Sequence, residues 1–316
     1  MSSMELTIAG VSLRSPLVAA AGAAGSGPEI LQAVPAGTFG AVTTKSITPE
    51  PREGHPPWRV LEVRGGMLNA VGLANPGLDV FMSDVVPELE AVQDSGVTFI
   101  GSIAGHTIDD YVSMASAFDG VEAIPLVEAN LSCPNTHTGR QFTDDPLAMK
   151  EVVSAIRESL PSTPLLVKLP LEMAPGFPVA MAAREAGADG LTMVNTVPAM
   201  GIDVDSRRPR LSNRAGGLSG PAIHHLAVRM IAGVRAELGK DDNTAIIGLG
   251  GVMRWQDAAE LILAGASAIG MATALYVDPR LAVRVGRGLS KWVRRQGVAS
   301  LSELTGAMSK DPIQPC

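Results

Sequence analysis

Short apolar runs alternate with amphipathic stretches from one end of the chain to the other. The apolar runs expected to form strands are residues 16–22, 39–46, 99–105, 124–130, 164–170, 190–196, 245–251 and 268–275. Such alternation favours a parallel sheet with helical crossovers over separate strand and helix domains. Eight strands are the number that closes a barrel. We therefore predict an α/β fold, a single (β/α)8 TIM barrel that occupies residues 1–316 as one domain.

Helical patterns lie between these runs. In residues 144–160, Asp144 or Asp145 can cap the helix and Pro146 suits its first turn. The apolar stripe expected on this helix consists of Leu147, Val152, Val153 and Ile156. Further helices are expected at residues 178–186, 221–238, 256–264 and 279–296.

Three segments fall outside this alternation. Residues 5–16 are expected to form an N-terminal β-hairpin that plugs the barrel floor. Residues 47–75 and 197–220 are too long and irregular for simple connections, and both follow strands. Loops after strands build the active-site face of a barrel, so these two are predicted to be inserted active-site loops. The alternative is that they are tolerated surface excursions.

Composition narrows the possible partners. The 316 residues include 25 Lys and Arg against 32 Asp and Glu, a net charge of −7, and only 3% are aromatic. We therefore expect no nucleic-acid binding and no attachment to an anionic membrane. The opening MSSMELTIAG lacks the features of a signal peptide, and no apolar run is long enough to span a bilayer. A cytoplasmic protein is expected.

Cysteine and histidine usage argues against a metal site. The two cysteines, Cys133 and Cys316, are too few and too far apart for a disulfide framework or a cysteine-ligated cluster. The five histidines show no ligand spacing with cysteine or carboxylate, and the pair His224 and His225 is expected at the surface of a helix. No bound metal is therefore predicted.

Polar side chains interrupt the apolar strands near their carboxyl ends. They are Lys45, Asn130, Lys168, Asn195 and Thr196. Each alone could be a structural polar residue with a satisfied partner. Because a barrel converges its strand ends on one volume, and a buried amine or amide is costly without partners, the set indicates a common ligand.

Glycine-rich turns follow the last two strands, at residues 248–251 (GLGG) and 270–274 (GMATA). Glycines let backbone N–H groups approach an oxyanion, and the loops after strands seven and eight are a recurrent phosphate cradle. A cofactor or substrate that carries a phosphate is expected there.

Cys133 lies in NLSCPNT, just past a strand. A thiol on a loop that faces a polar site can act as a base or nucleophile, because its pKa is within reach of neutral pH. The alternative is a small inert apolar side chain, but Pro134 and two neighbouring carboxamides make a core position unfavourable. We predict that Cys133 is catalytic.

Several of these motifs together resemble the dihydroorotate dehydrogenase family. They are TTKSITPEPREGHPPWR, GGMLNAVGLANPG, EANLSCPNT, LVKLP, TMVNT, GIDVDSRRPRLSNRAGGLSGPAI, IIGLGGV and GMATAL, which run in order to about Pro279. A cysteine rather than a serine as base resembles class 1, and GMLNAVGLANPG, TMVNT and GGLSGPAI are most similar to the class 1B catalytic subunit.

The resemblance implies FMN as cofactor and oxidation of (S)-dihydroorotate to orotate in pyrimidine biosynthesis. Cys133 would take the proton from C5 while hydride passes from C6 to flavin N5. The substrate-binding positions implied are Lys45, Asn69, Val71, Gly72, Leu73, Asn130, Asn135, Asn195 and Thr196. The cofactor-binding positions implied are Ala21, Gly22, Lys45, Ser46, Asn130, Lys168, Gly216, Gly217, Gly250, Gly251, Ala272 and Thr273.

The resemblance leaves the electron acceptor open. The chain has no second nucleotide fingerprint and no cysteine cluster, so NAD as acceptor implies a separate subunit with FAD and an iron–sulfur centre. A homodimer that uses fumarate would need no such subunit.

Departures from the family pattern leave other functions open. Residues 20–25 read AAGAAG where the family has a motif like ASGTFG, and His55 and Trp58 replace the usual Asn and Pro. These changes leave room for a paralogue acting on another cyclic amide or unsaturated ring. A flavin-free lyase with Lys168 as Schiff-base amine and an inactive scaffold subunit are the remaining alternatives.

Overall fold

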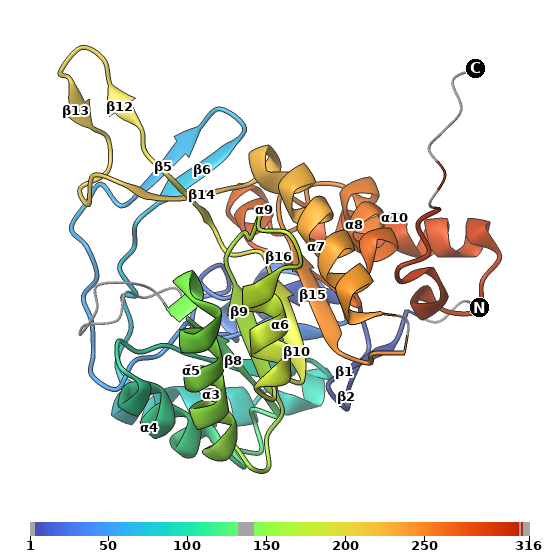
Figure 1. The fold of residues 1–316 in the computed structure, drawn as a ribbon, viewed down its shortest axis with the longest axis horizontal. Helices are drawn as coiled ribbons and strands as arrows, with labels where there is room; N and C mark the ends of the chain where they lie inside the picture. Colours follow the sequence, from blue (N-terminus) through green and yellow to red (C-terminus); the bar gives the residue numbers. More distant parts are fainter. Residues whose placement is uncertain (1–3, 132–141, 240, 310, 312–316) are drawn as a thin grey trace.

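Eight parallel strands close a barrel in the computed structural model, which describes residues 4–131, 142–239, 241–309 and 311 (Figure 1). The strands are β3 (Leu17–Ala19), β4 (Ala41–Thr43), β7 (Thr98–Ile103), β8 (Leu126–Asn130), β9 (Leu165–Leu169), β10 (Gly190–Met193), β15 (Ala245–Leu249) and β16 (Ala268–Met271). They pair in chain order, and β16 pairs with β3 to complete the circle. This confirms the predicted (β/α)8 fold.

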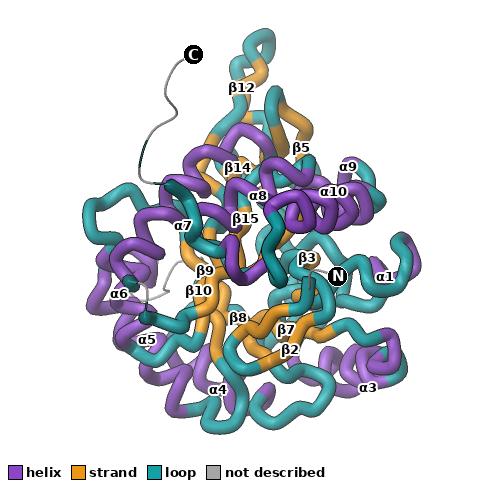
Figure 2. The backbone as a smooth tube through the Cα atoms, turned by 90° about the vertical axis from the view of Figure 1, so that its right-hand side faces the viewer, coloured by secondary structure: helices purple, strands orange, loops and turns teal. Residues whose placement is uncertain are grey.

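Helices surround the barrel (Figure 2). They are α1 (Glu29–Ala33), α2 (Leu78–Val80), α3 (Val86–Glu90), α4 (Ile108–Phe118), α5 (Pro146–Glu158), α6 (Pro178–Glu185), α7 (His224–Leu238), α8 (Trp255–Ala264), α9 (Thr273–Val277) and α10 (Leu281–Gln296). A π-helical turn, η1 (Phe81–Val85), joins α2 to α3, and the 3-10 turns are η2 (Gln93–Ser95), η3 (Phe142–Asp144), η4 (Pro221–Ile223) and η5 (Leu301–Leu304). Among the described helices, none combines the length and the apolar character needed to cross a bilayer.

Two details of the expected elements were wrong. The last strand stops at Met271, and residues 273–275 begin α9 instead of continuing the strand. In α5, Asp145 is the N-cap and accepts a hydrogen bond from the Leu147 amide at 3.0 Å, but the Leu147 side chain is 76% exposed. Leu147 lies on the solvent side of the first turn, and Met149 is the buried residue there.

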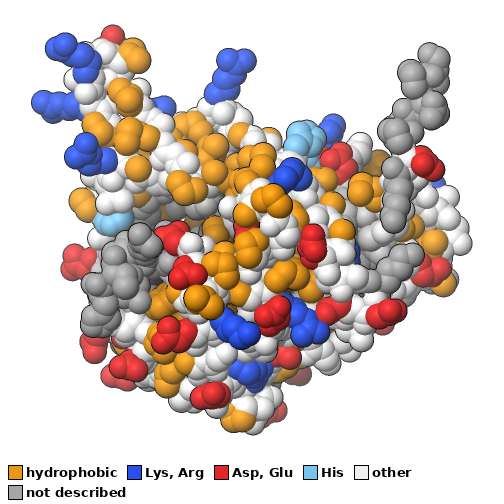
Figure 3. Space-filling model, viewed as in Figure 1, with side chains coloured by type: hydrophobic (Ala, Val, Ile, Leu, Met, Phe, Trp, Pro, Cys, Tyr) orange, Lys and Arg blue, Asp and Glu red, His pale blue; other side chains and the backbone are white. Residues whose placement is uncertain are grey.

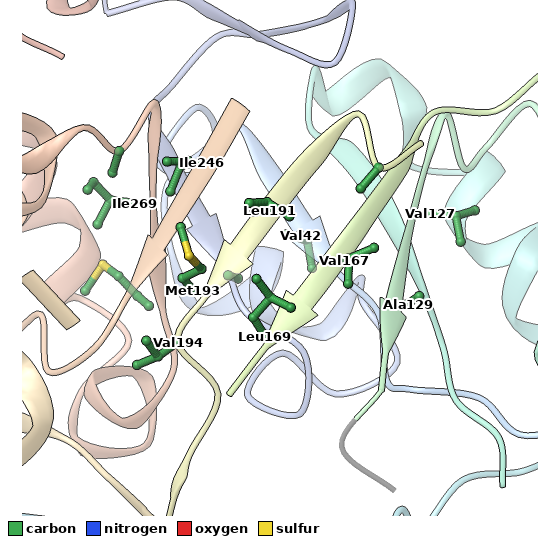
Figure 4. Close-up of a cluster of buried hydrophobic side chains, with 14 of the residues drawn as sticks. Val42, Val127, Ala129, Val167, Leu169, Leu191, Met193, Val194, Ile246 and Ile269 are labelled. Carbon is green, nitrogen blue, oxygen red and sulfur yellow. The ribbon is translucent and has the colours of Figure 1, made fainter. Parts of the chain in front are cut away.

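Alternate residues of the strands face two different cores, as the period of two requires. Val127, Val167 and Leu191 belong to a large cluster that also includes helix residues such as Val153 and Ile156, and Figure 4 shows its members along adjacent strands. Residues of the other parity point into the barrel. They include Leu126, Leu166, Ala245 and Ala268.

The N-terminal hairpin closes one end of this interior. Strands β1 (Leu6–Ile8) and β2 (Val11–Leu13) pair antiparallel. Ile8 and Leu13 are fully buried in the same cluster as Leu126 and Leu166, which lie near the starts of their strands. The hairpin therefore plugs the floor of the barrel, as predicted.

The two inserted segments form a sheet of their own. Strands β5 (Val60–Val63) and β6 (Gly66–Asn69) pair with β11 (Val197–Ala199) and β14 (Gly216–Ser219) in the order β11-β14-β6-β5, all antiparallel. A short hairpin of β12 (Ile202–Asp203) and β13 (Arg208–Pro209) projects beyond them (Figure 1). The segments expected to be irregular are thus mutually ordered, because each supplies the other with strand partners.

Candidate active site

A chain of hydrogen bonds links polar side chains across the carboxyl ends of the strands. The Ser46 and Ser102 hydroxyls lie 2.8 Å apart, and the Asn130 amide Nδ2 donates to the Ser46 hydroxyl at 3.2 Å. Asn195 Nδ2 donates to Asn130 Oδ1 at 3.3 Å, and the Thr196 backbone amide donates to Asn195 Oδ1 at 2.8 Å. Four predicted site residues, which end or follow three different strands, are therefore in one network.

Lys168 lies beside this network inside the barrel. It pairs in register with Asn130 on one side and with Thr192 on the other. It shares the inward parity of Leu166, and only 7% of the residue is exposed. Lys168 therefore places a buried amine at the edge of the carboxamide network.

A buried acid forms part of the same inner layer. Glu128 is 2% exposed, and its Oε2 accepts a hydrogen bond from the Thr192 hydroxyl at 2.8 Å. Its other oxygen, Oε1, has no hydrogen-bond partner among the described residues. The barrel interior is therefore apolar at its floor and polar near its strand ends.

Lys45 is held in a partly buried position under the inserted segment. Burial lowers the pKa of Lys45, and the positive charge of Arg59 lowers it further. The Arg59 guanidinium donates to the carbonyls of Glu53 and His55 at 3.0 and 3.1 Å, which fixes the position of its charge within this loop. An anionic or electron-rich ligand near Lys45 would raise its pKa and favour its charged form.

The turn of residues 71–73 is pinned by His55. The His55 backbone amide donates to the Val71 carbonyl at 3.0 Å, and His55 Nδ1 lies 2.9 Å from the Ala70 carbonyl oxygen. Gly72 and Leu73 both have left-handed backbones, with φ of 76° and 55°. Such a turn exposes consecutive backbone amides on one side, which suits an anion.

Asn69 and the β14 glycines connect the inserted sheet to the strand ends. Asn69 Nδ2 donates to the Gly217 carbonyl at 3.4 Å. A Cβ atom on Gly217 would overlap the Thr196 hydroxyl, and one on Gly216 would overlap the Asn69 carbonyl. The backbone of β14 therefore lies against the polar network with no room for a side chain at these two glycines.

The glycine-rich turns gather on the opposite side of the site. The Thr273 hydroxyl donates to the Ser219 hydroxyl at 2.8 Å, and the Tyr276 hydroxyl donates to the Gly22 carbonyl. A Cβ on Gly251 would lie 2.7 Å from the Gly220 carbonyl. The predicted phosphate-side residues after β15 and β16 thus meet the end of β14 and the turn after β3, where Ala21 and Gly22 lie.

These residues fit a flavin mononucleotide. A Cβ placed on Gly22 would meet no atom within 4 Å, so the turn after β3 borders open space at the strand ends. Around that side of the barrel lie two amines, several carboxamides and glycine turns, which are the donors that a phosphate and an electron-poor ring require.

Two predicted residues, Cys133 and Asn135, lie outside the described residues. Sequence reasoning missed Ser102, Ser219, Arg59 and Glu128. A signal existed for Ser102 and Glu128, because both are polar residues in apolar runs. The expectation that His224 lies at the surface was wrong. It is 5% exposed, and its Nδ1 lies 2.7 Å from the Gly250 carbonyl oxygen.

The chain is an eight-stranded α/β barrel with amides, amines and glycine turns at the carboxyl ends of its strands. Enzymes with this fold have their active sites on that face. The dihydroorotate dehydrogenase family model matches residues 3–293, and the chain belongs to this family. It is accordingly an oxidoreductase that acts on CH–CH donors.

The relatives agree with this assignment over nearly the whole chain. The dihydroorotate dehydrogenase B (NAD(+)) catalytic subunit of Trichlorobacter lovleyi is 40% identical over 306 residues, covering 96% of this chain and 98% of the relative. The subunit of the same name from Listeria innocua is 40% identical over 305 residues, with the same coverage. A crystal structure of the Eimeria tenella dihydroorotate dehydrogenase in complex with ferulenol shares the fold, with a TM-score of 0.79 at 23% identity over 96% of this chain and 88% of that one.

Proposed function

We propose that this chain oxidises (S)-dihydroorotate to orotate with FMN, as one cytoplasmic domain that serves pyrimidine biosynthesis. The observation that carries the proposal is the hydrogen-bonded series Ser102, Ser46, Asn130, Asn195 and Thr196 with Lys168 beside it. Membership of the dihydroorotate dehydrogenase family supports the substrate.

The carboxamides would bind the substrate ring. A dihydropyrimidine ring alternates N–H donors and carbonyl acceptors, and amide side chains supply both partners. Asn69, Asn130 and Asn195 come from separate elements and would approach the ring from different sides, with Asn135 and Thr196 completing the set. The backbone amides of Val71, Gly72 and Leu73 would hold the ring carboxylate.

The proton would leave through Cys133. Its thiolate takes the proton from C5, and the C–H electron pair forms the new C5–C6 double bond as hydride departs from C6. The FMN, when bound, accepts that hydride. The chain would contribute by holding the thiolate and the ring in one fixed orientation. Ideal alignment of two reacting groups can lower the activation free energy by about 7–11 kcal/mol.

Lysines and glycine turns would hold the cofactor. Lys45 and Lys168 place positive charge where electron density increases, with Ser46 and Asn130 as neighbouring donors. The phosphate would rest among Gly216, Gly217, Gly250, Gly251, Ala272 and Thr273, with Ala21 and Gly22 along the ring. The tyrosine–glycine contact between Tyr276 and Gly22 fixes the turn after β3.

The experiment is to identify both cofactor and product. Purified protein is denatured, and the released chromophore is compared with FMN by mass. The native protein is then incubated with dihydroorotate and an artificial electron acceptor. FMN at about one per chain and stoichiometric orotate are expected, whereas a colourless protein or the absence of orotate would refute the proposal.

We further propose a partner subunit carrying FAD and an iron–sulfur centre. The catalytic-subunit name of the relatives supports this proposal. So does the projecting β12–β13 hairpin, where Ile202 and Val204 are 59% and 80% exposed beside Arg207 and Arg208. Figure 3 shows this mixture of apolar and basic side chains at the tip. The catalytic chain itself is proposed to be a homodimer.

Turnover assays distinguish NAD from fumarate as the electron acceptor. NAD-dependent turnover is expected only when the partner subunit is added. Fumarate-dependent turnover by the chain alone would instead favour the homodimer without a partner. Unaltered turnover by a complex that carries Cys133→Ala would revive the scaffold alternative.

A second candidate function is oxidation of another cyclic amide or reduction of an unsaturated ring. His55, which pins the turn of residues 71–73, and the neighbouring Trp58, which is 72% exposed, favour it because both depart from the family pattern at the mouth of the site. A substrate panel distinguishes the two, since dihydroorotate should have the highest kcat/KM if the first proposal holds. The flavin-free lyase alternative finds no support in the family assignment.

A further inference from the structure

Three potential metal ligands converge outside the barrel wall, next to the turn that follows the carboxyl end of β15. His224 and His225 open α7, and Glu260 lies on the adjacent helix α8. His224 Nε2 is 3.3 Å from Glu260 Oε2, and His225 Nδ1 is 3.9 Å from the same oxygen. One ligand atom from each residue lies within 4.8 Å of the others.

The shortest of these separations matches the spacing of ligand atoms around a tetrahedral ion. Metal bonds of about 2.0–2.1 Å to nitrogen and oxygen place neighbouring ligand atoms roughly 3.4 Å apart. The 3.3 Å distance already meets this value, and the 3.9 Å distance needs only a small side-chain rotation. The side chains of His225 and Glu260 are 87% and 44% exposed, so they can make that adjustment, and an ion can enter from solvent.

The least mobile of the three ligands is already oriented. His224 is buried, and its Nδ1 lies 2.7 Å from the Gly250 carbonyl oxygen. With Nδ1–H donating to that carbonyl, the Nε2 lone pair points toward Glu260. A ligating histidine commonly donates its second ring N–H to a carbonyl in this way, which fixes its tautomer and ring orientation.

Both positive and negative charges lie around the three residues. The start of α7 carries partial positive charge, which disfavours a metal ion. The negative charge of Glu260 opposes this partial positive charge, and the Asp257 carboxylate also interacts electrostatically with His224. Arg254 pairs with Asp257 at 2.9 Å, and its positive charge also interacts electrostatically with Glu260.

We propose that His224, His225 and Glu260 form a binding site for a divalent transition ion of the zinc class, with water as a further ligand. Two imidazoles and one carboxylate are a ligand set that zinc accepts. The bound ion would join α7 to α8 and, through His224, hold the Gly250 carbonyl in place. The site does not depend on the proposed flavin chemistry. The prediction of no metal rested on sequence spacing, which cannot show that Glu260 folds beside the histidines.

The test is calorimetric titration of the metal-free, flavin-loaded protein with ZnCl2. Wild type is compared with His225→Ala and Glu260→Gln, and Glu237→Gln on exposed α7 surface serves as the charge-matched control. Cys133 and Cys316 are present in every variant, so zinc bound by thiols cancels from the comparison. Because His225 is a surface residue, its replacement leaves the folded protein available for measurement, which circular dichroism verifies.

One zinc equivalent is expected to be lost, or weakened by at least about tenfold, in His225→Ala and Glu260→Gln and retained in Glu237→Gln. Zinc should also raise the Tm of wild type more than that of His225→Ala, because an ion that binds only the folded state stabilises it. Equal zinc binding by wild type and both ligand variants, or none at millimolar zinc, would overturn the proposal and leave an ordinary ion pair.

Discussion

Asn195 donates a hydrogen bond to Asn130 at 3.3 Å although their strands, β10 and β8, are separated by β9. The contact fixes both amide orientations. Asn130 Nδ2 is directed to Ser46, and Asn195 Oδ1 accepts from the Thr196 amide. Residues that are far apart in sequence are thus held as one donor and acceptor surface, which is what recognition of a planar ring requires.

Asn195→Ala removes two hydrogen bonds from this surface. At about 1 kcal/mol for each bond, kcat/KM for dihydroorotate should fall roughly thirtyfold. Steady-state kinetics check this result. Asn243→Ala, an exposed amide at the other end of the barrel, should leave kcat/KM unchanged, and equal effects of the two substitutions would contradict the assignment of Asn195 to the site.

Cys133→Ala should slow reduction of the bound flavin by about 10²- to 10⁴-fold near neutral pH, the usual range for loss of a general base. Flavin content should not change, because the proposed cofactor contacts lie elsewhere. Cys316→Ala is the matched control and should behave as wild type. Stopped-flow absorbance measures both, and an undiminished rate in Cys133→Ala would exclude the thiol as base.

Lys45→Met should stabilise the flavin-free protein while it impairs catalysis. The pKa of Lys45 is lowered by burial and by Arg59, so its charged form is disfavoured in the folded state. That destabilisation is fully present below the folded pKa and disappears as pH rises toward the ordinary lysine value of 10.5. The gain in Tm over wild type should therefore shrink at alkaline pH.

The activity of Lys45→Met should fall by about 10²-fold, as for loss of one group that stabilises developing charge. Lys150→Met is the control, since Lys150 is an exposed residue in a surface pair with Glu185 at 3.5 Å. It should change neither property appreciably. A lower Tm for flavin-free Lys45→Met would show that Lys45 is instead a stabilising structural residue.

Gly217→Ala should destabilise the protein by about 1–3 kcal/mol, because the added Cβ would overlap the Thr196 hydroxyl and separate β14 from the strand ends. Chemical denaturation measures the change, and KM should rise with it. Gly286→Ala is the contrasting substitution. Gly286 lies in α10, where the new Cβ would be 3.5 Å from the Leu17 side chain of β3, and the helical preference for alanine should add up to about 1 kcal/mol. Similar effects at both positions would contradict this packing.

The barrel was predictable from sequence because its signals are local. Each buried strand is a short apolar run, and α5 carries both its Asp145 cap and Pro146 in the first turn. Inward strand positions such as Asn130 and Lys168 stand out against apolar neighbours, so their convergence follows from the fold. The N-terminal hairpin was visible for the same reason.

The remaining features depend on distant pairing. Residues 47–75 and 197–220 carry little strand pattern individually, and β6 and β14 become strands because they pair with each other. His224 appeared to be a surface residue, because the Gly250 carbonyl and Glu260 reach it only in three dimensions. Leu147 fits the apolar stripe by spacing, but it lies in the first turn of α5, where the helix is open to solvent.

The most direct test is the visible spectrum of the purified protein before and after dihydroorotate is added without oxygen. We predict a yellow protein whose flavin absorbance is lost within the mixing time of a stoichiometric addition and returns when air is admitted. A yellow protein that dihydroorotate leaves unchanged, while another cyclic amide bleaches it, would contradict the assignment of the substrate.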